Sequence, residues 1–319
     1  MSTLLLSREE VRGLLNMPEI IEAVEQAFRD WAHGKARMPT KSYMLLEKGD
    51  FRAMPGAIPG AAGVKWVNVH LGNSKLGLPT IMAILIYSDP DTGYPLAIMD
   101  ATDITAYRTG ATAAIASKYL ARENSRTLGL VGAGHQAYTQ LLAHAELFKL
   151  KEIRVFDIKK EAVDKLIKSL PQYSIKGSSL EETVASDIVC TLTPARESVV
   201  KKEWVKPGTH INAIGADAEG KEELEPSILK EAMVVVDDMK QSSLGGEINV
   251  PIRKGLYKVE DVYGTLGEVI SGKKQGRTVE KIITIFDSTG VAIEDMAIAQ
   301  LVYKKARAKG GYLSRNFVE

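Results

Sequence analysis

The spacing with the clearest chemical meaning is the turn Gly132-Ala133-Gly134-His135-Gln136-Ala137, a G-x-G-x-x-A pattern. Its first glycine permits a tight turn, the second lets the backbone approach a pyrophosphate, and Ala137 lets a helix pack closely on the preceding strand. A buried strand is expected at residues 127–131, and a helical pattern follows the turn, so free N–H groups and the helix dipole would hold phosphates. The pattern also occurs in ordinary strand-to-helix turns, but this context favours a dinucleotide site.

Asp157 strengthens this interpretation, because it closes the next expected strand, at residues 153–157. From there its carboxylate can accept hydrogen bonds from an adenosine ribose. A carboxylate also repels a 2′-phosphate, so Asp157 favours NAD over NADP. Lys159 and Lys160 lie just beyond it and weaken that preference.

Four basic residues occur where a structural segment would not need a charge: Lys41, Arg52, Lys65 and Arg108. In the strand-like residues 64–70, period-2 alternation places Lys65 on the apolar face of Val67 and Val69. A lysine there must be paired or must line a cavity. Each residue alone could be a solvated surface charge. Together they predict a cationic pocket for a small carboxylate, which a guanidinium binds at two points while a lysine acts as a point charge or proton carrier.

Further ligand contacts are expected where parallel strands end, because ligands bind beyond their carboxyl ends. Residues 191–194, 212–217 and 286–290 supply amides and hydroxyls for a nicotinamide or its ribose. Asp217 is the best-placed carboxylate for proton transfer or for a substrate amine, although it could equally be an acid at a helix N-terminus. Residues 245–249 are either a second acidic loop or a simple turn.

The elements that position these residues fall into two patterns. After residue 125, strands near 127–131, 153–157, 187–191, 209–214, 233–237 and 282–286 alternate with helices, which indicates an α/β, doubly wound parallel sheet. Residues 38–101 contain short strand-like runs at 42–46, 51–54, 64–70, 80–87 and 94–99, separated by turn residues, as in an antiparallel meander.

Helices are expected in the remaining segments. Ser7 to Glu10 form a capping box for a short helix, and a longer helix should run from about Pro18 to Gly34. A helix at residues 103–121, rich in alanine and glycine, should pack closely against other backbone, and one at about 291–308 should return to the first domain.

The composition excludes several classes of protein. A chain of 319 residues is too long for one compact core, so two domains are expected. The net charge of +1 gives no basis for a nucleic-acid or anionic-membrane surface. The single cysteine, Cys190, lies in an apolar run and suits a buried thiol in a reducing compartment. With no apolar run of membrane-spanning length and no signal-peptide pattern, a cytoplasmic protein is expected.

No metal site is predicted, because the five histidines show no metal-binding spacing with one another or with Cys190. The sequence also lacks a G-x-S-x-G, a P-loop and an H-E-x-x-H motif. Hydrolase and metalloenzyme interpretations therefore have no support.

Ordered blocks along nearly the whole chain resemble the ornithine cyclodeaminase/mu-crystallin family, and within it the archaeal-type alanine dehydrogenases. The blocks that carry the resemblance are residues 38–41, 52–55, 63–68, 77–80, 99–102, 108–111, 132–137, 208–217, 245–249 and 286–290. The resemblance implies an α+β substrate-binding and dimerisation domain from both chain ends, residues 1–122 and 293–319. An NAD-binding Rossmann domain, residues 123–292, lies between them, and the protein is expected to be a homodimer.

The resemblance also implies roles for individual residues. Lys65 and Asp217 would be catalytic, and Lys41, Arg52 and Arg108 would bind the substrate carboxylate, with Arg108 also able to contact cofactor phosphate. The predicted contacts to NAD are Arg108, Thr109, Gly132, Ala133, Gly134, His135, Gln136, Asp157, Ile158, Lys159, Thr191, Thr193, Ala213, Gly215 and Ser288.

The implied activity is NAD-dependent oxidative deamination of L-alanine to pyruvate and ammonia, with cations of the meander and Asp217 meeting over one nicotinamide ring. Two alternatives stay within enzymes: ornithine cyclodeamination to proline and ammonia, and reduction of a cyclic ketimine. A third is a mu-crystallin-like, nucleotide-dependent binding protein. The four cations and Asp217 argue against it, because a pure binder needs no proton-transfer groups.

Overall fold

The computed structural model describes residues 2–318. The chain forms two compact units, which we call the terminal unit (Met1–Arg108 and Val291–Glu319) and the central unit (Thr109–Gly290). The first boundary between them lies inside helix α3 (Thr102–Leu120), whereas the expected boundary was residue 122, after that helix. Among the described residues, no helix combines the length and apolarity needed to cross a membrane.

The terminal unit contains a seven-stranded sheet in the order β15-β1-β6-β5-β4-β3-β2. Strands β2 to β6 pair in sequence and antiparallel, which confirms the predicted meander. Two strands of this sheet were not predicted: β1, which pairs parallel with β6, and β15 beside it. The strands are β1 (Thr3–Leu6), β2 (Ser42–Leu46), β3 (Gly49–Ile58), β4 (Ala61–Val69), β5 (Ile81–Ser88), β6 (Pro95–Asp100) and β15 (Ser314–Arg315).

Strand β3 is longer than predicted, because it continues through Pro55 instead of ending there. A proline lacks the N–H of a ladder hydrogen bond and is tolerated where a strand has a free edge. The pairing of β2 with β3 ends at Ala53, so Pro55 lies beyond β2 and needs no partner on that side. The longer strand carries Arg52 in its middle rather than near its end.

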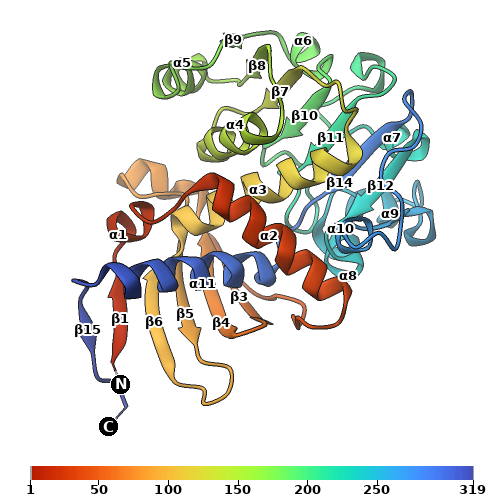
Figure 1. The fold of residues 1–319 in the computed structure, drawn as a ribbon. Helices are drawn as coiled ribbons and strands as arrows, with labels where there is room; N and C mark the ends of the chain where they lie inside the picture. The colour runs from red at the N-terminus through yellow and green to blue at the C-terminus, as the bar shows by residue number, and fades with distance from the viewer. Residues whose placement is uncertain (1, 319) are drawn as a thin grey trace. The chain divides into compact units, whose positions relative to one another are not determined.

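Helices cover one face of this sheet: α1 (Arg8–Arg12), α2 (Met17–Ala32) and α11 (Ala292–Lys309). The capping box at Ser7 is confirmed, and Asn16 caps α2 through the N–H of Glu19. Figure 1 shows α2 and α11 crossing the strands, and α11 contacts β3, β4 and β5. Because the first turns of α11 lie wholly inside the protein, every side chain there needs an apolar neighbour or a polar partner.

The central unit contains an eight-stranded sheet in the order β13-β12-β14-β11-β10-β7-β8-β9, and all of its pairings are parallel. The predicted doubly wound sheet is therefore confirmed. The chain moves outward from β7 in one direction and from β10 in the other, so the switch point lies between these two strands. The strands are β7 (Thr127–Val131), β8 (Glu152–Phe156), β9 (Ile175–Gly177), β10 (Ile188–Thr191), β11 (His210–Ala213), β12 (Ala232–Val236), β13 (Gly264–Thr265) and β14 (Ile283–Asp287).

Both faces of this sheet are covered, and each has its own hydrophobic cluster. Alternate residues of β10 divide between them: Val189 belongs to one cluster, and Ile188 and Cys190 to the other. The helices of the unit are α4 (His135–Leu147), α5 (Lys160–Ser169), α6 (Leu180–Val184), α7 (Pro226–Glu231), α8 (Met239–Gly245), α9 (Asn249–Arg253) and α10 (Leu266–Ile270). Residues 2–318 also contain 3-10 helices at Leu71–Leu76, Lys202–Trp204 and Val259–Asp261.

Helix α3 packs backbone to backbone against α4, as its small residues predicted. A Cβ at Gly110 would lie 2.4 Å from the carbonyl oxygen of Thr139, so only glycine fits there. The Nε2 of Gln140 donates to the carbonyl oxygen of Thr109 at 3.4 Å, next to this contact. The close approach fixes α4, whose first residues form the glycine turn.

Candidate active site

The turn after β7 has the geometry that the sequence predicts for a phosphate cradle. Gly132 has φ +109°, and a Cβ there would lie 3.2 Å from the carbonyl oxygen of Leu192, so both backbone conformation and space require glycine. The N–H of Gly132 donates to the carbonyl oxygen of Phe156 at 2.8 Å. Asp157 closes the turn, because its Oδ2 accepts from the N–H of Ala133 at 2.8 Å and its Oδ1 from the N–H of Lys159 at 2.8 Å.

These residues fit a dinucleotide. Helix α4 begins after Gly134 with no side chain capping its N-terminus, so a phosphate can take the place of a cap. The Cβ position of Gly134 has no heavy atom within 4 Å, so the backbone faces open space. Both Asp157 oxygens already accept a backbone hydrogen, but a carboxylate has further lone pairs for a ribose hydroxyl. His135 and Gln136, in the first turn of α4, and the exposed Ile158, after β8, lie beside this cradle.

The loops after β10 and β11 are held by the buried Glu223, which was not predicted from the sequence. Its carboxylate accepts from the hydroxyls of Thr191 and Thr193, each at 2.7 Å, and from the N–H of Gly215 at 2.9 Å. Burial raises the pKa of Glu223 above the usual value, although these donors lower it. Because the two threonine hydroxyl hydrogens are used inside the protein, Thr191 and Thr193 hold these loops in place through Glu223.

Two other buried acids hold the neighbouring loops. Asp287, at the end of β14, accepts from the N–H of Glu247 at 2.9 Å and of Ile248 at 3.3 Å. Glu247 itself accepts from the N–H of Leu224 at 2.7 Å, and burial next to Glu223 raises its pKa well above the usual value. Residues 245–249 are therefore the turn between α8 and α9, and the carboxylate of Glu247 within it is buried and structural. The N–H of Ser288 donates to the carbonyl oxygen of Ala213 at 3.0 Å, which joins the ends of β14 and β11.

Asp217 lies in the loop after β11 and is half-buried. The alternative that it is an acid at a helix N-terminus is wrong, because the next helix, α7, begins at Pro226. Its carboxylate is ion-paired with Lys221, and its N–H donates to the carbonyl oxygen of Gly215 at 3.1 Å. The carboxylate is therefore held in the loop by Lys221 and stays partly exposed.

In the terminal unit, the sheet register places the predicted cations on one face. Arg52 lies opposite Tyr43 on β2 and Val67 on β4, while Lys65 lies opposite Met54. Residues two apart on a strand share a face, so Arg52 and Lys65 lie on the same face as Val67, as period-2 alternation predicted. Both side chains are buried, Lys65 completely.

Lys65 is paired with a carboxylate 230 positions away: its Nζ lies 2.7 Å from Oδ1 of Asp295 on α11, and neither side chain has any exposed surface. Burial lowers the pKa of Lys65 from 10.5 to about 8, because it disfavours the ammonium more than Asp295 favours it. Lys65 can therefore both donate and accept a proton near pH 8, as a general acid and base must.

Arg108 completes this network. Its NH1 donates to Oε2 of Glu294 at 2.8 Å, and its Nε lies 3.3 Å from Oδ1 of Asp295, the oxygen that also binds Lys65. Both cations were predicted from the sequence, but neither acid was. A signal for them exists, because Glu294 and Asp295 are adjacent charges within an otherwise apolar stretch of helix, residues 291–299.

The cationic groups of Arg52 and Lys41 both lie against the ring of Tyr43. The Nε of Arg52 donates to Oδ1 of Asp50 at 2.8 Å, and the guanidinium lies 5.2 Å from the ring centroid of Tyr43. The Nζ of Lys41 lies 5.6 Å from the same centroid. Two buried cations thus lie against one aromatic ring, and a guanidinium in this position can bind a small carboxylate at two points.

The fold and the glycine turn define the chain as a Rossmann-type dinucleotide-binding protein. The model of the ornithine cyclodeaminase/mu-crystallin family matches residues 1–310. The chain belongs to this family, which confirms the resemblance found in its sequence.

Three relatives are similar over almost the whole chain. The alanine dehydrogenase of Archaeoglobus fulgidus is 52% identical over 311 residues, which cover 97% of each chain. The structure of an archaeal alanine dehydrogenase dimer with bound NAD has a TM-score of 0.98 and 51% identity and covers 100% of both chains. The Thermococcus litoralis Delta(1)-pyrroline-2-carboxylate reductase, in complex with NADH and L-proline, has a TM-score of 0.93 and 38% identity and covers 98% of this chain and 100% of the other.

The open space at Gly134 predicts that a methyl group there blocks the ligand without harming the fold. Gly134→Ala should leave the melting temperature unchanged and weaken NAD binding by about tenfold or more, because the Cβ would occupy the space that a pyrophosphate approaches. Calorimetric titration with NAD measures this effect. Gly72→Ala, which also has no atom within 4 Å of its Cβ, is the control. Equal NAD affinity in both variants would contradict the assignment.

The Lys65–Asp295 pair predicts a pH-dependent loss of stability. Asp295 raises the pKa of Lys65, so Asp295→Asn should lower it further below its value of about 8. At pH 6 the folded variant then holds an unpaired ammonium, or must release its proton, and should be less stable than the wild type by about 3 kcal/mol. This difference in the free energy of unfolding should shrink as the pH rises toward 8. In that range the folded variant binds fewer protons than its unfolded form, so its stability rises with pH. Urea unfolding between pH 6 and 9 measures it.

The double variant Lys65→Met, Asp295→Asn provides the control for this pH dependence. It carries neither charge of the pair. The difference between its free energy of unfolding and that of the wild type should therefore not rise steeply toward pH 8. A deficit in Asp295→Asn that does not change with pH would show that the two groups are not coupled.

Proposed function

We propose that this protein is an NAD-dependent amino-acid dehydrogenase that converts L-alanine, NAD and water to pyruvate, ammonium, NADH and a proton. The observation that carries the proposal is the 52% identity to an alanine dehydrogenase over 97% of both chains. The buried cations of the terminal unit support it, because an α-amino acid needs a partner for its carboxylate and a group that moves protons.

In this proposal Arg52 and Lys41 bind the substrate carboxylate. The guanidinium is already oriented by Asp50 and by the Tyr43 ring, so little rotational freedom is lost when a carboxylate binds. Arg108 adds positive charge but is held by Glu294 and Asp295, which makes it a positioning residue for the Lys65 network.

Lys65 and Asp217 move protons. With its pKa at about 8, Lys65 can take a proton from the water that attacks the iminium carbon and return one to the departing amine. Asp217, oriented by its ion pair with Lys221, accepts hydrogen bonds from the substrate amine. NAD, when bound, accepts the hydride from the α-carbon. Gly132, Ala133, Gly134, His135, Gln136 and Asp157 would hold it, with Thr109, Ile158, Lys159, Thr191, Thr193, Ala213, Gly215 and Ser288 as further contacts.

A second candidate function, reduction of a cyclic ketimine, has specific support, because the Thermococcus litoralis relative is 38% identical. Ornithine cyclodeamination is the other enzymatic alternative within the family. Each needs a buried acid-base group, so the Lys65–Asp295 pair does not distinguish them. It does argue against a nucleotide-dependent binding protein, which gains nothing from a lysine whose pKa lies near pH 8.

A substrate screen followed at the NADH absorbance distinguishes these functions. NADH formation with L-alanine, and its oxidation with pyruvate and ammonium, is the expected result. Proline and ammonia from ornithine without net NADH would establish the cyclodeaminase, and NADH oxidation with only a cyclic ketimine would establish the reductase. NADH binding without turnover of any of these compounds would establish the binding protein.

Removal of the proposed carboxylate clamp should affect the substrate and not the cofactor. Arg52→Ala should raise the KM for L-alanine by roughly 100-fold, because two charge-assisted hydrogen bonds are lost, while NAD affinity stays within about twofold. Steady-state kinetics and NAD titration measure the two effects. Arg37→Ala, an exposed arginine of the same unit, serves as the control. An unchanged KM in Arg52→Ala would remove Arg52 from the site.

We also propose a homodimer, formed by the sheet face of the terminal unit that α2 and α11 leave uncovered. Trp66, Ile84 and Ile86 are 43%, 54% and 41% exposed on this face. Trp66 and Ile84 pair directly across β4 and β5. Adjacent exposed apolar residues of this size usually mark an interface, and the archaeal relative is a dimer.

This interface predicts the effect of a single charge. Ile84→Glu should convert the dimer to a monomer in sedimentation velocity, because an unpaired carboxylate would be buried when the two faces meet. Leu244→Glu, which alters a similarly exposed apolar residue of the central unit, should leave the dimer intact. A dimer that persists in Ile84→Glu would place the interface elsewhere.

A further inference from the structure

The central unit has a pocket at the opposite end of β7 from the glycine turn. A pocket of about 670 Å³ lies between the end of α3, the segment before β7, the end of α4 and residues 277–280 before β14. These segments are at the edge where β7 and β14 begin, whereas the glycine turn follows the end of β7. The pocket is therefore separate from the proposed NAD cradle.

Positive charge is concentrated in this pocket. Its lining contains Lys118, Arg122, Arg126, Lys149 and Arg277, against the two acids Glu123 and Glu280. This excess of three positive charges contrasts with a net charge of +1 for the whole chain. Charges of one sign around a concave surface focus the electric field and concentrate counter-ions there.

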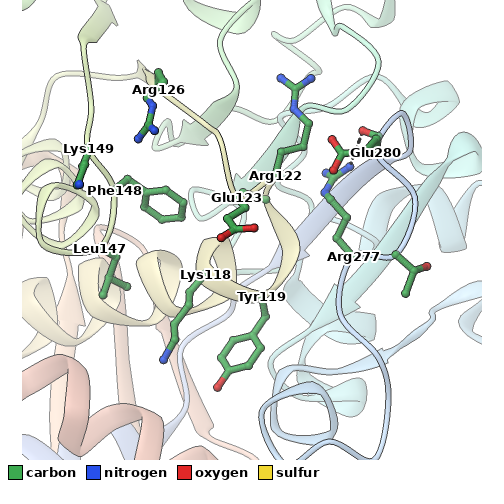
Figure 2. Close-up of a pocket in the computed structure, with 12 residues that line it drawn as sticks. Lys118, Tyr119, Arg122, Glu123, Arg126, Leu147, Phe148, Lys149, Arg277 and Glu280 are labelled. Atoms are coloured by element: carbon green, nitrogen blue, oxygen red, sulfur yellow. Dashed lines mark hydrogen bonds between the residues drawn. The ribbon is translucent and has the colours of Figure 1, made fainter.

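The cations differ in how far the protein itself neutralises them. Arg122 is ion-paired with Asp187 at 2.5 Å, but its buried Nε has no acceptor among the described residues. Within residues 2–318, no carboxylate pairs with the side chain of Arg126 or Lys149. Figure 2 shows these two side chains on the side of the pocket that Phe148 also lines.

Arg277 contributes charge without being available for direct contact. Its guanidinium donates to the carbonyl oxygens of Leu120 and Ile282, at 2.7 and 2.5 Å, and to the hydroxyl of Thr284 at 2.8 Å. None of these acceptors carries a charge. Burial and the neighbouring Arg122 lower the pKa of Arg277 to about 10, as expected where cations gather without matching acids.

We propose that this pocket binds a small phosphate monoester dianion through Arg126 and Lys149. The two unneutralised cations match its two charges: a guanidinium can bind two phosphate oxygens and an ammonium a third. The ring of Phe148 and the side chain of Leu147 offer an apolar wall to the organic part of the ester. The volume lies within the range of small-molecule sites. The proposal is independent of the proposed dehydrogenase activity.

The test uses the full-length protein saturated with NAD, so that added phosphate cannot occupy the glycine turn. Glucose 6-phosphate and inorganic phosphate are titrated at pH 8 by calorimetry, in sodium chloride of constant ionic strength. Both probes are expected to bind. In Arg126→Ala, Lys149→Ala the affinity should fall by about 30-fold or more, because two charge-assisted contacts are lost.

The matched control is Lys165→Ala, Lys168→Ala, which removes two exposed charges from α5 of the same unit and should leave the affinity unchanged. Lys149→Glu alone provides a second test, because Lys149 is exposed and its replacement does not disturb the core. Binding of inorganic phosphate but not glucose 6-phosphate would overturn the monoester assignment. Absence of binding, or equal affinities in the pocket and control variants, would overturn the site.

Discussion

The ion pair between Lys65 and Asp295 is the interaction on which the packing of the terminal unit and the proposed chemistry both depend. An unpaired charge at this depth would cost several kcal/mol, so neither residue can be buried without the other. The pair joins β4 to α11, segments from opposite ends of the chain, and α11 must therefore return to the sheet for the site to exist. Arg108, bound to the same carboxylate, extends this constraint to α3.

Buried carboxylates have the corresponding role in the central unit, where they bind backbone N–H groups instead of cations. Glu223, Glu247 and Asp287 each hold a loop that follows a strand of the sheet. Such loops would otherwise lose their shape, because their amides have no strand or helix partners. The glycine turn is held in the same way by Asp157, so one kind of interaction organises the whole ligand-binding edge.

The sequence predicted those features whose signals are local. The periodicity of residues 127–131 and the glycine turn predict a strand and a helix N-terminus without knowledge of the rest of the chain. The prediction that Lys65 lies on the apolar face of its strand came, in the same way, from its alternation with Val67 and Val69. Strands β1 and β15 were missed because they are short, and their stability comes from pairing with distant residues. Pro55 was misinterpreted because β2 stops before it, which only the register reveals.

The acids of the site illustrate the same limit. Asp295 and Glu223 look like ordinary charged residues in the sequence, and their roles come from partners that the fold brings to them across 230 and 32 positions. A charged residue in a buried stretch signals that some partner exists, but pairing it with a particular cation needs the three-dimensional structure. The sequence could thus suggest candidate ligand-binding residues, but not the acids Glu223, Glu294 and Asp295 that hold some of them.

The most direct test of the account is the pH dependence of kcat/KM for L-alanine in the wild type and in Asp295→Asn. If Lys65 moves protons, the wild type should show an inflection near pH 8. The variant should show the same inflection at lower pH, because it lacks the carboxylate that favours the ammonium. An inflection at the same pH in both proteins would contradict the assignment of Lys65 as the group that titrates.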